Sequence, residues 1–323
     1  MSVLIAFLSL VVEFALGYPD WLFRAIGHPV TWFGRLISFL DRRLNRATDP
    51  DALRRKRGVQ ALLVIVLVPA IIGLGVQILF WFVPMGLVIT ALLATSLLSQ
   101  KSLYEHVEAV ADALDTGGIA LARLAVSRIV GRDPETPDRA GVCRAAIESL
   151  AENFSDGIVA PAFWTGVGGR AGGAAYKAAN TADSMIGHRT PRHEAFGWAA
   201  ARFDDWINLP ASRLTALLIV LAAFFVKGAD AKKAWHAVRR DAKKHRSPNA
   251  GWPEAAMAGA LGLALAGPRF YGGVLVDDVF MGEGGRREAD SLDIRQALKL
   301  YRVADYLLIA LFGLVSVVVI VVT

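Results

Sequence analysis

The longest apolar run in the chain decides its fold class. Residues 59–98 read VQALLVIVLVPAIIGLGVQILFWFVPMGLVITALLATSLL and contain no Asp, Glu, Lys or Arg. A helix needs about 20 residues to cross a bilayer, so this run is long enough for two spans. Pro84 predicts the turn between them, because backbone groups in a membrane must otherwise stay paired within a helix. We therefore expect a helical hairpin with spans near 59–79 and 80–98.

Further apolar segments lie at both ends of the chain and in its third quarter. Residues 306–322 predict a terminal span, and residues 2–16 form a shorter segment interrupted only by Glu13. The first segment lacks the basic start and cleavage site of a secretory signal, so we expect it to be retained as a span. Its Glu13 either lies at the membrane interface or faces the protein interior. Residues 213–226 and 255–266 are short for spans, and we expect re-entrant or protein-buried helices there.

The composition adds a polar part to this membrane core. The chain of 323 residues is 54% hydrophobic, yet 20% of its residues are charged, which is too many for lipid-embedded helices alone. We therefore expect one domain over residues 1–323, an all-α polytopic integral membrane protein with a large helical portion in the cytoplasm or at the membrane surface. That portion includes the polar site region 99–210. The net charge of +6 agrees with cytoplasmic basic loops.

Charge and cysteine content exclude some classes of function. Nucleic-acid binding is disfavoured, because the basic residues flank apolar segments. The single Cys143 excludes an internal disulfide, and we expect it to be a packing residue. Residues 17–58 are rich in arginine and aromatic side chains, so we expect a cytoplasmic interfacial loop there. Within it, His28-Pro29 reads most simply as an interfacial anchor.

The informative polar residues lie between positions 144 and 208. Glu148, Glu152 and Asp156 recur at four-residue intervals, which places three carboxylates on one face if the helix continues. A divalent cation would relieve their repulsion, but a solvated acidic face explains these three residues equally well. Two further groups follow in helical stretches: Lys177, Asn180, Thr181, Asp183 and Ser184, and then Arg202, Asp204, Asp205 and Asn208. Because such side chains are costly in a hydrophobic protein unless they converge, we expect one shared site.

The residue types in these groups indicate metal and phosphate chemistry. Carboxylate, amide and hydroxyl oxygens suit Mg²⁺ that keeps water and phosphate oxygens, and Lys and Arg suit phosphate. The chain has no Gly-x-x-x-x-Gly-Lys-Ser/Thr loop, so any ATP is bound in another way. His188 and His193 lack the spacing of a zinc helix. The glycines of 166–173 predict a turn used for packing or flexibility rather than for cradling a nucleotide.

A second polar cluster reads HRSPNAGWPE over residues 245–254. Its Ser247-Pro-Asn sequence predicts a turn. His245 and Arg246 suit an anion, although a surface turn is the simpler interpretation of this cluster taken alone.

Several segments of the chain, taken together, carry a family resemblance. They are HPVTWFGRLI at 28–37, SRIVGRD at 127–133, ENFSDGIVAP at 152–161, YKAANTADSM at 176–185, ARFDD at 201–205 and SPN at 247–249. In this order they resemble the CobD/CbiB family of cobalamin biosynthesis proteins, the adenosylcobinamide-phosphate synthases, over almost the whole chain. One departure is Gly17-Tyr18-Pro19, where the family often has Gly-Asp-Pro.

The resemblance implies a reaction. It is an ATP-dependent amide formation that joins aminopropanol, or aminopropanol phosphate, to a propionate of adenosylcobyric acid, with Mg²⁺ as cofactor. The product is adenosylcobinamide or its phosphate. Amide formation from a free carboxylate is uphill in water, so the simplest route is an acyl phosphate attacked by the amine. The resemblance also implies a multi-pass protein of the cell inner membrane, with its active site facing the cytoplasm, where ATP is available.

Residue type and clustering then give candidate roles within that reaction. The catalytic candidates are Glu148, Glu152, Asn153, Asp156, Lys177, Asn180, Asp183, Ser184, Arg202, Asp204 and Asp205. The metal candidates among them are Glu152, Asp156, Asp183 and Asp205. The substrate-binding candidates are His28, Arg35, Arg128, Arg132, His245, Arg246, Ser247 and Asn249. Phosphate contacts are expected from Lys177, Arg202, Arg128 and Arg132, and substrate orientation from Asn153, Asn180 and Ser184.

Two other functions remain open from the residues. A Mg²⁺-dependent membrane alcohol or prenyl transferase also sets Asp and Asn around a diphosphate, but it needs full spans enclosing the site, whereas these acids lie in polar surroundings. A non-catalytic scaffold would use the acids as partner contacts. A homo-oligomer and contacts with other cobalamin-pathway enzymes are both compatible with the sequence.

Overall fold

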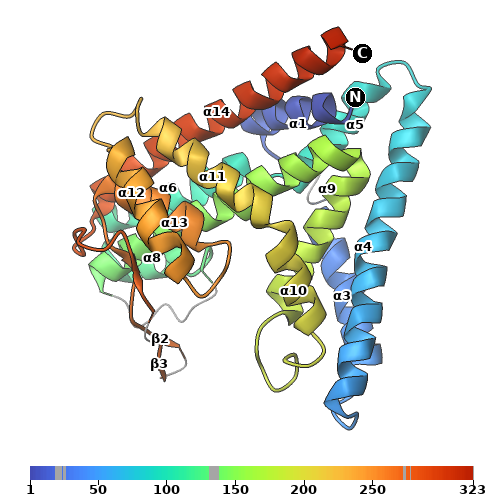
Figure 1. The fold of residues 1–323 in the computed structure, drawn as a ribbon, viewed down its shortest axis with the longest axis horizontal. Coiled ribbons are helices and arrows are strands. Elements are labelled where there is room, and N and C mark those ends of the chain that lie inside the picture. Colours follow the sequence, from blue (N-terminus) through green and yellow to red (C-terminus); the bar gives the residue numbers. More distant parts are fainter. Residues whose placement is uncertain (19–23, 25–26, 131–137, 272–273, 277, 323) are drawn as a thin grey trace. The chain divides into compact units, whose positions relative to one another are not determined.

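Helices dominate the computed structural model, which describes residues 1–18, 24, 27–130, 138–271, 274–276 and 278–322 (Figure 1). The chain divides into two compact units. Unit 1 comprises Met1–Ser99, Ala160–Asn208 and Leu311–Thr323, and unit 2 comprises Gln100–Val159 and Leu209–Ala310. Each unit therefore combines segments that are far apart in the sequence.

Unit 1 is built from helices. They are α1 (Ser2–Leu16), α3 (Pro29–Leu44), α4 (Asp51–Trp81), α5 (Gly86–Ala94), the 3-10 turn η1 (Thr95–Leu97), α9 (Ala160–Ile186), α10 (Trp198–Ile207) and the end of α14 (Ser291–Val322). Helix α1 packs against α5 and α9, and its Ser9 hydroxyl donates to the Ala91 carbonyl oxygen at 3.0 Å. Glu13 of α1 is 1% exposed and so faces the interior, one of the two positions expected for it.

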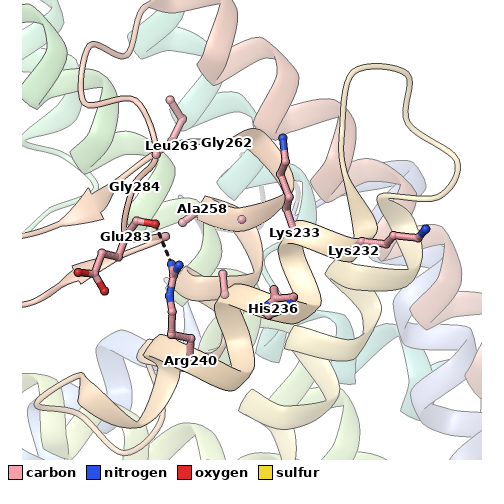
Figure 2. Close-up of a pocket in the computed structure, with 13 residues that line it drawn as sticks. Lys232, Lys233, His236, Arg240, Ala258, Gly262, Leu263, Glu283 and Gly284 are labelled. Atoms are coloured by element: carbon pink, nitrogen blue, oxygen red, sulfur yellow. Dashed lines mark hydrogen bonds between the residues drawn. The ribbon is translucent and has the colours of Figure 1, made fainter.

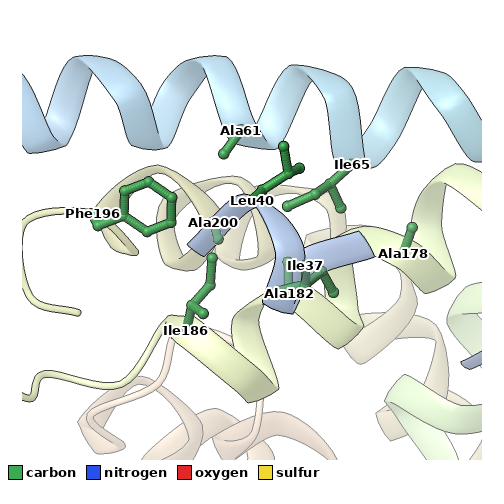
Figure 3. Packing of buried hydrophobic residues seen from close by; sticks show 9 residues of the cluster. All are labelled: Ile37, Leu40, Ala61, Ile65, Ala178, Ala182, Ile186, Phe196 and Ala200. Atoms are coloured by element: carbon green, nitrogen blue, oxygen red, sulfur yellow. The ribbon is translucent and has the colours of Figure 1, made fainter. Parts of the chain in front are cut away.

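One face of α9 forms the core of unit 1. Ala178, Ala182 and Ile186 recur every four residues, so they lie on one side of the helix and pack against α3, α4 and α10 (Figure 3). The small side chains allow a close approach of the helices. The buried cluster consists of Ile37, Leu40, Ala61, Ile65, Ala178, Ala182, Ile186, Phe196 and Ala200. The opposite face of α9 is left for polar side chains.

Unit 2 combines helices with two small antiparallel strand pairs. The helices are α6 (Gln100–Thr116), α7 (Gly118–Val126), α8 (Arg139–Phe154), the π-helical turn η2 (Ser155–Val159), α11 (Leu209–Ala222), α12 (Ala231–Asp241), the 3-10 turn η3 (Ala242–Lys244), α13 (Gly251–Leu261) and the first part of α14. Strand β1 (Leu265–Ala266) pairs with β4 (Phe280–Met281), and β2 (Arg269–Tyr271) pairs with β3 (Val274–Val276). The single cysteine, Cys143, is fully buried in α8, which confirms its expected packing role.

Long apolar helices identify the chain as an all-α membrane protein. Among the described residues, α4, residues 86–116 and α14 are long and apolar enough to cross a membrane. Helices α10 and α11 together are either a broken fourth span or a re-entrant loop, and a re-entrant helix was one of the forms expected for residues 213–226. Large apolar side chains on them are exposed, among them Ile71 at 66% and Leu79 at 64% on α4 and Leu314 at 64% on α14. Such surfaces are stable only when lipid covers them. The chain turns between α4 and α5 at residues 82–85, as Pro84 predicted.

The expected loop over residues 17–58 is wrong, because most of this segment is helical. Helix α3 begins after His28, whose Nδ1 accepts the backbone N–H of Val30 at 3.3 Å, and it has Pro29 at its first position. Ile37 and Leu40 on one face of α3 are buried, so the segment is amphipathic and its arginines occupy the outer face. The arginine content concealed this helical pattern.

The glycine-rich segment 166–173 is a kink within α9 and not a separate turn. Gly169 has φ 61° and ψ −152°, a conformation that favours glycine. A Cβ there would also overlap the amide group of Gln77 on α4, and Gln77 Oε1 accepts the backbone N–H of Arg170 at 2.8 Å. Gly169 therefore serves packing against α4.

Candidate functional site

A polar network on α9 and α10 forms the candidate site of unit 1. Asp204 Oδ1 accepts a hydrogen bond from Asn180 Nδ2 at 3.3 Å, and Asp204 Oδ2 accepts one from Asn208 Nδ2 at 2.9 Å. The Tyr176 hydroxyl donates to Asn208 Oδ1 at 2.8 Å. Asp204 is only 8% exposed and Asn208 only 1%. Because each buried polar atom of this chain of contacts has a partner, the network fixes the carboxylate of Asp204.

Asp183 lies one turn beyond Asn180 on α9, at the end of the helix. The backbone N–H of Gly187 donates to the Asp183 carbonyl oxygen at 2.7 Å and closes the last turn. A Cβ at position 187 would overlap Asp183 Oδ1, so only glycine leaves the carboxylate in place. The local sequence Asp183-Ser-Met-Ile-Gly187 thus ends the helix and also leaves room for the Asp183 carboxylate.

Three carboxylates interact electrostatically at this site. Burial raises the pKa of Asp183, the charge of His188 opposes that rise, and the charge of Asp205 adds to it. Asp204 in turn feels the charges of Asp183 and Asp205. A divalent cation would relieve this mutual repulsion.

The donor set fits a partly hydrated Mg²⁺ better than a metal held by protein alone. In the part of the chain that the structure describes, no three His, Cys, Asp or Glu side chains form a group able to hold a metal ion. Mg²⁺ commonly binds one or two carboxylates and completes its shell with water and substrate phosphate. Asp183 and Asp205 match that pattern, and the buried Asp204 interacts electrostatically with both.

A basic cavity adjoins these acids. It has a volume of about 200 Å³, and Asp205 lies in its wall together with three arginines. The guanidinium of Arg55 lies 5.8 Å from the centre of the Trp198 ring, and Arg202 Nη1 is 3.8 Å from Asp205 Oδ2. The lining residues are Arg55, Gly187, Arg189, Glu194, Trp198, Ala201, Arg202 and Asp205. Clustered guanidinium groups are the usual protein ligands of phosphate.

Sequence reasoning found Arg202 and Asp205 but missed Arg55 and Arg189. Arg55 belongs to the basic run before the first long span, which was interpreted as an orientation signal. Arg189 follows His188 just after the end of α9 and carried no signal of its own. Their only common feature is spatial, since both line the cavity that contains Asp205.

Other predicted residues of unit 1 lie on α9 or at α3. Burial and the charge of Lys177 lower the pKa of His28 to about 4, so these two predicted residues are electrostatic neighbours and His28 is neutral at pH 7. The Ser184 hydroxyl donates to the Asn180 carbonyl oxygen at 3.0 Å. Arg35 is exposed on α3.

The first predicted acidic group belongs to unit 2 and does not form a uniform face. Helix α8 ends at Phe154, and Asp156 lies in the π-helical turn that follows. Glu148 is 5% exposed, and its Oε1 accepts the backbone N–H of Ala266 at 2.8 Å, whereas Glu152 is exposed. Asn153 Nδ2 donates to the Ser149 carbonyl oxygen at 2.9 Å. The regular α-helix on which a shared face of the three carboxylates depended therefore ends before Asp156.

The structure thus brings together the second and third predicted groups. The metal candidates divide between the units, with Asp183 and Asp205 in unit 1 and Glu152 and Asp156 in unit 2. Convergence of the two pairs remains a prediction.

The predicted turn at Ser247-Pro-Asn is confirmed, with Arg246 and Pro248 exposed and Asn249 buried. His245 Nδ1 accepts the backbone N–H of Ser247 at 3.0 Å, and the side chains of His245 and Glu254 are 8% and 5% exposed. Asn249 Oδ1 accepts hydrogen bonds from Ser212 Oγ at 3.2 Å and Arg213 Nη1 at 2.9 Å. These contacts give the cluster a structural use, and its part in substrate binding remains a prediction. Arg128 and Arg246 are exposed, and Arg132 lies outside the described residues.

Known proteins match this chain over nearly its whole length. The sequence model of a family described as CobD/Cbib protein matches residues 6–301. The cobalamin biosynthesis protein CobD of Sinorhizobium sp is 52% identical over 300 residues, which cover 92% of this chain and 93% of the relative. Proteins of the same name from Rhizobium meliloti (strain 1021) and Rhodobacter capsulatus are 50% and 47% identical, each covering at least 93% of both chains. No solved structure matches the chain.

Proposed function

Since the chain belongs to the CobD/Cbib protein family, we propose that it acts in cobalamin biosynthesis as an amide-forming synthase of the membrane. The proposed reaction joins aminopropanol, or aminopropanol phosphate, to a propionate of adenosylcobyric acid with consumption of ATP. The product is adenosylcobinamide or its phosphate. The proposed location is the cell inner membrane, with the site facing the cytoplasm.

One observation carries this proposal. Asp205 lies in the wall of a cavity that also contains Arg55, Arg189 and Arg202, and it interacts with Asp183 on the neighbouring helix. Acids and arginines side by side can hold a cation and a phosphoryl group together. A scaffold has no need for a recessed cavity of this composition.

Asp183 and Asp205 would hold Mg²⁺, which when bound supplies positive charge for phosphoryl transfer. The chain's own arginines would bind the transferred phosphoryl group and stabilise its charge. The propionate oxygen attacks the γ-phosphorus, ADP leaves, and an acyl phosphate forms. The amine nitrogen then attacks the acyl carbon, and inorganic phosphate leaves.

Proton removal from the amine requires a base in the same site. Because Asp183 and Asp205 would hold Mg²⁺, this base is expected among the predicted acids that do not bind the metal. Asp204 would act as a positioning residue, because Asn180 and Asn208 hold its two oxygens. Lys177, on the same helix as Asn180 and Asp183, would contribute a further positive charge for phosphate.

The test is an assay of the purified chain with adenosylcobyric acid, Mg²⁺-ATP and each of the two amines in turn. We expect amide product together with ADP and inorganic phosphate, whereas an adenylate route would release AMP and pyrophosphate. Asp183→Asn and Asp205→Asn should lower the rate by about a hundredfold or more. Glu105→Gln, at an exposed carboxylate of α6, is the matched control. Normal synthesis by correctly inserted Asp183→Asn and Asp205→Asn variants would overturn the assignment.

A further inference from the structure

A second basic cavity lies in unit 2, between α12, α13 and the loop 282–285 (Figure 2). Its volume is about 420 Å³. Four side chains of α12 with basic groups line one wall, namely Lys232, Lys233, His236 and Arg240. Both lysines and His236 are exposed, so they are available to a ligand.

The opposite wall is made largely of glycine backbone. Gly262, Gly282 and Gly284 have φ of 67°, 76° and 84°, the left-handed region that favours glycine. A Cβ added at Gly262 or Gly284 would meet no atom within 4 Å, so space lies open beside the backbone at both positions. At Gly259 a Cβ would lie 2.5 Å from the Lys233 carbonyl oxygen, which shows how closely α12 and α13 approach. Peptide groups therefore border the cavity directly.

Arg240 and Asp241 fix the geometry of the cavity. Arg240 Nε and Nη2 donate to the two oxygens of Asp241 at 2.8 and 2.6 Å. Nη2 also donates to the Glu283 carbonyl oxygen at 2.9 Å (Figure 2). Asp241 Oδ2 accepts the backbone N–H of Gly282 at 3.0 Å and is fully buried. The ion pair thus ties the end of α12 to the glycine loop.

The net charge of the residues that line the cavity is positive even after Arg240 is paired with Asp241. Asp241 balances Arg240, and Glu283, which also lines the cavity, lies 3.5 Å from Lys244. Lys233 is 3.7 Å from Asp230 at the start of the helix, a surface contact that adds little. Lys232, Lys233 and His236 therefore line the cavity as the basic groups of α12 that Asp241 does not balance.

We propose that this cavity binds the phosphoryl group of a ligand, either a soluble phosphorylated molecule or the headgroup of an anionic lipid. Ammonium groups opposite a glycine-rich backbone are a recurrent arrangement for phosphate, because the backbone can approach the oxygens closely while the lysines supply charge. This site belongs to unit 2, whereas the acid–arginine site belongs to unit 1. The proposal does not depend on the amide-forming reaction.

Lysine footprinting tests the proposal at the residues themselves. The full chain in neutral detergent is acetylated with and without pyrophosphate, and in a second arm with and without dihexanoyl phosphatidylglycerol, and the modified peptides are quantified by mass spectrometry. We expect a ligand to slow acetylation of Lys232 and Lys233 severalfold. Lys299, exposed on α14, is the internal control and should react at an unchanged rate.

Charge variants on the same helix sharpen the test. Lys232→Gln combined with His236→Gln should weaken binding of the protecting ligand by about tenfold or more. Arg239→Gln removes one exposed charge from α12 without reaching the cavity and should bind normally. Since all these side chains are exposed, none of the changes should unfold the chain.

The outcomes separate the two sources of phosphate. Protection by pyrophosphate alone indicates a soluble ligand, protection by the lipid alone indicates a headgroup, and both support a phosphoryl site. Protection by neither, or equal weakening in Arg239→Gln, overturns the proposal. The footprint should persist in Asp183→Asn, so a failure of the proposed amide synthesis would not be mistaken for a failure of this site.

Discussion

Asn180 Nδ2 donates a hydrogen bond to Asp204 Oδ1 at 3.3 Å and so connects α9 to α10 through the site. Of the two amides that hold Asp204, Asn180 is the one supplied by the other helix. Loss of either amide would leave a buried carboxylate oxygen without a donor, which is costly in a protein interior.

Asn180→Ala should therefore destabilise the chain by about 1–3 kcal/mol and lower the rate of amide synthesis. Denaturant unfolding in micelles and the synthase assay measure the two effects. Gln60→Ala removes an exposed amide from α4 and serves as the control. Equal stability of the two variants would contradict the structural role given to Asn180.

Gly187→Ala should impair activity by displacing the Asp183 carboxylate, because the new Cβ overlaps Asp183 Oδ1. The matched control is Gly168→Ala on the same helix, where a Cβ meets no atom within 4 Å. We expect a loss of about tenfold or more in kcat/KM for the first variant and normal activity for the second. Comparable activity would show that the position of Asp183 is unimportant.

The packing of α4 gives a second matched pair. A Cβ at Gly58 would overlap the Phe196 carbonyl oxygen, whereas one at Gly75 meets no atom within 4 Å. Gly58→Ala should cost about 1–3 kcal/mol of unfolding free energy, and Gly75→Ala should be neutral or slightly stabilising. Chemical denaturation of both variants checks the difference, and the reverse order would refute the packing of α4 against Phe196.

Arg55→Gln and Arg189→Gln test the two arginines that sequence reasoning missed. If they bind phosphate in the cavity beside Asp205, each should raise KM for ATP by about tenfold while the fold stays intact. Arg46→Gln, at an exposed arginine outside the cavity, is the control. An unchanged KM in both cavity variants would place the nucleotide elsewhere.

Asp241 should make stability dependent on acid pH. Burial alone would raise the pKa of Asp241, but the hydrogen bond from Arg240 and those from the backbone of Glu283 and Gly282 hold it below its usual range. The unfolded chain then binds its proton first, so this contribution is complete above about pH 4 and is lost as the pH falls through the folded-state pKa.

Asp241→Asn should accordingly lower stability at neutral pH and flatten the loss of stability below about pH 4. Unfolding curves of both proteins between neutral and acid pH provide the measurement. Parallel curves for the wild type and the variant would be inconsistent with a carboxylate held ionised by Arg240.

The sequence allowed the membrane hairpin and the helices of the site to be predicted for physical reasons. An uncharged run with Pro84 near its turn has few stable forms other than two helices in a bilayer. Lys177, Asn180 and Ser184 could be placed on one face with Asp183 close by, because helical periodicity is a local property. The clustering of Asp183 with Asp204 and Asp205 followed from the cost of leaving such groups apart in a hydrophobic protein.

The remaining features depend on contacts between distant residues. Glu148 is held by the backbone N–H of Ala266, far along the chain, and a backbone donor leaves no mark in the sequence. The π-helical turn after Phe154 changed the spacing on which the three-carboxylate face was based. Helix α3 was missed because its arginines were interpreted as part of an interfacial loop. Ile37 and Leu40 nevertheless lie on successive turns of α3 and are buried.

At the kink at Gly169, the side chain of Gln77 supports the part of α9 that carries the candidate site. Helix α9 changes direction there, and the half after the kink carries Lys177, Asn180 and Asp183. The hydrogen bond from the Arg170 backbone N–H to Gln77 Oε1 helps to set the direction of this half. Gln77 is part of a helix whose tilt the bilayer itself would govern. If the proposed synthase activity depends on the direction of this half of α9, lipid discs of differing acyl length should change its rate.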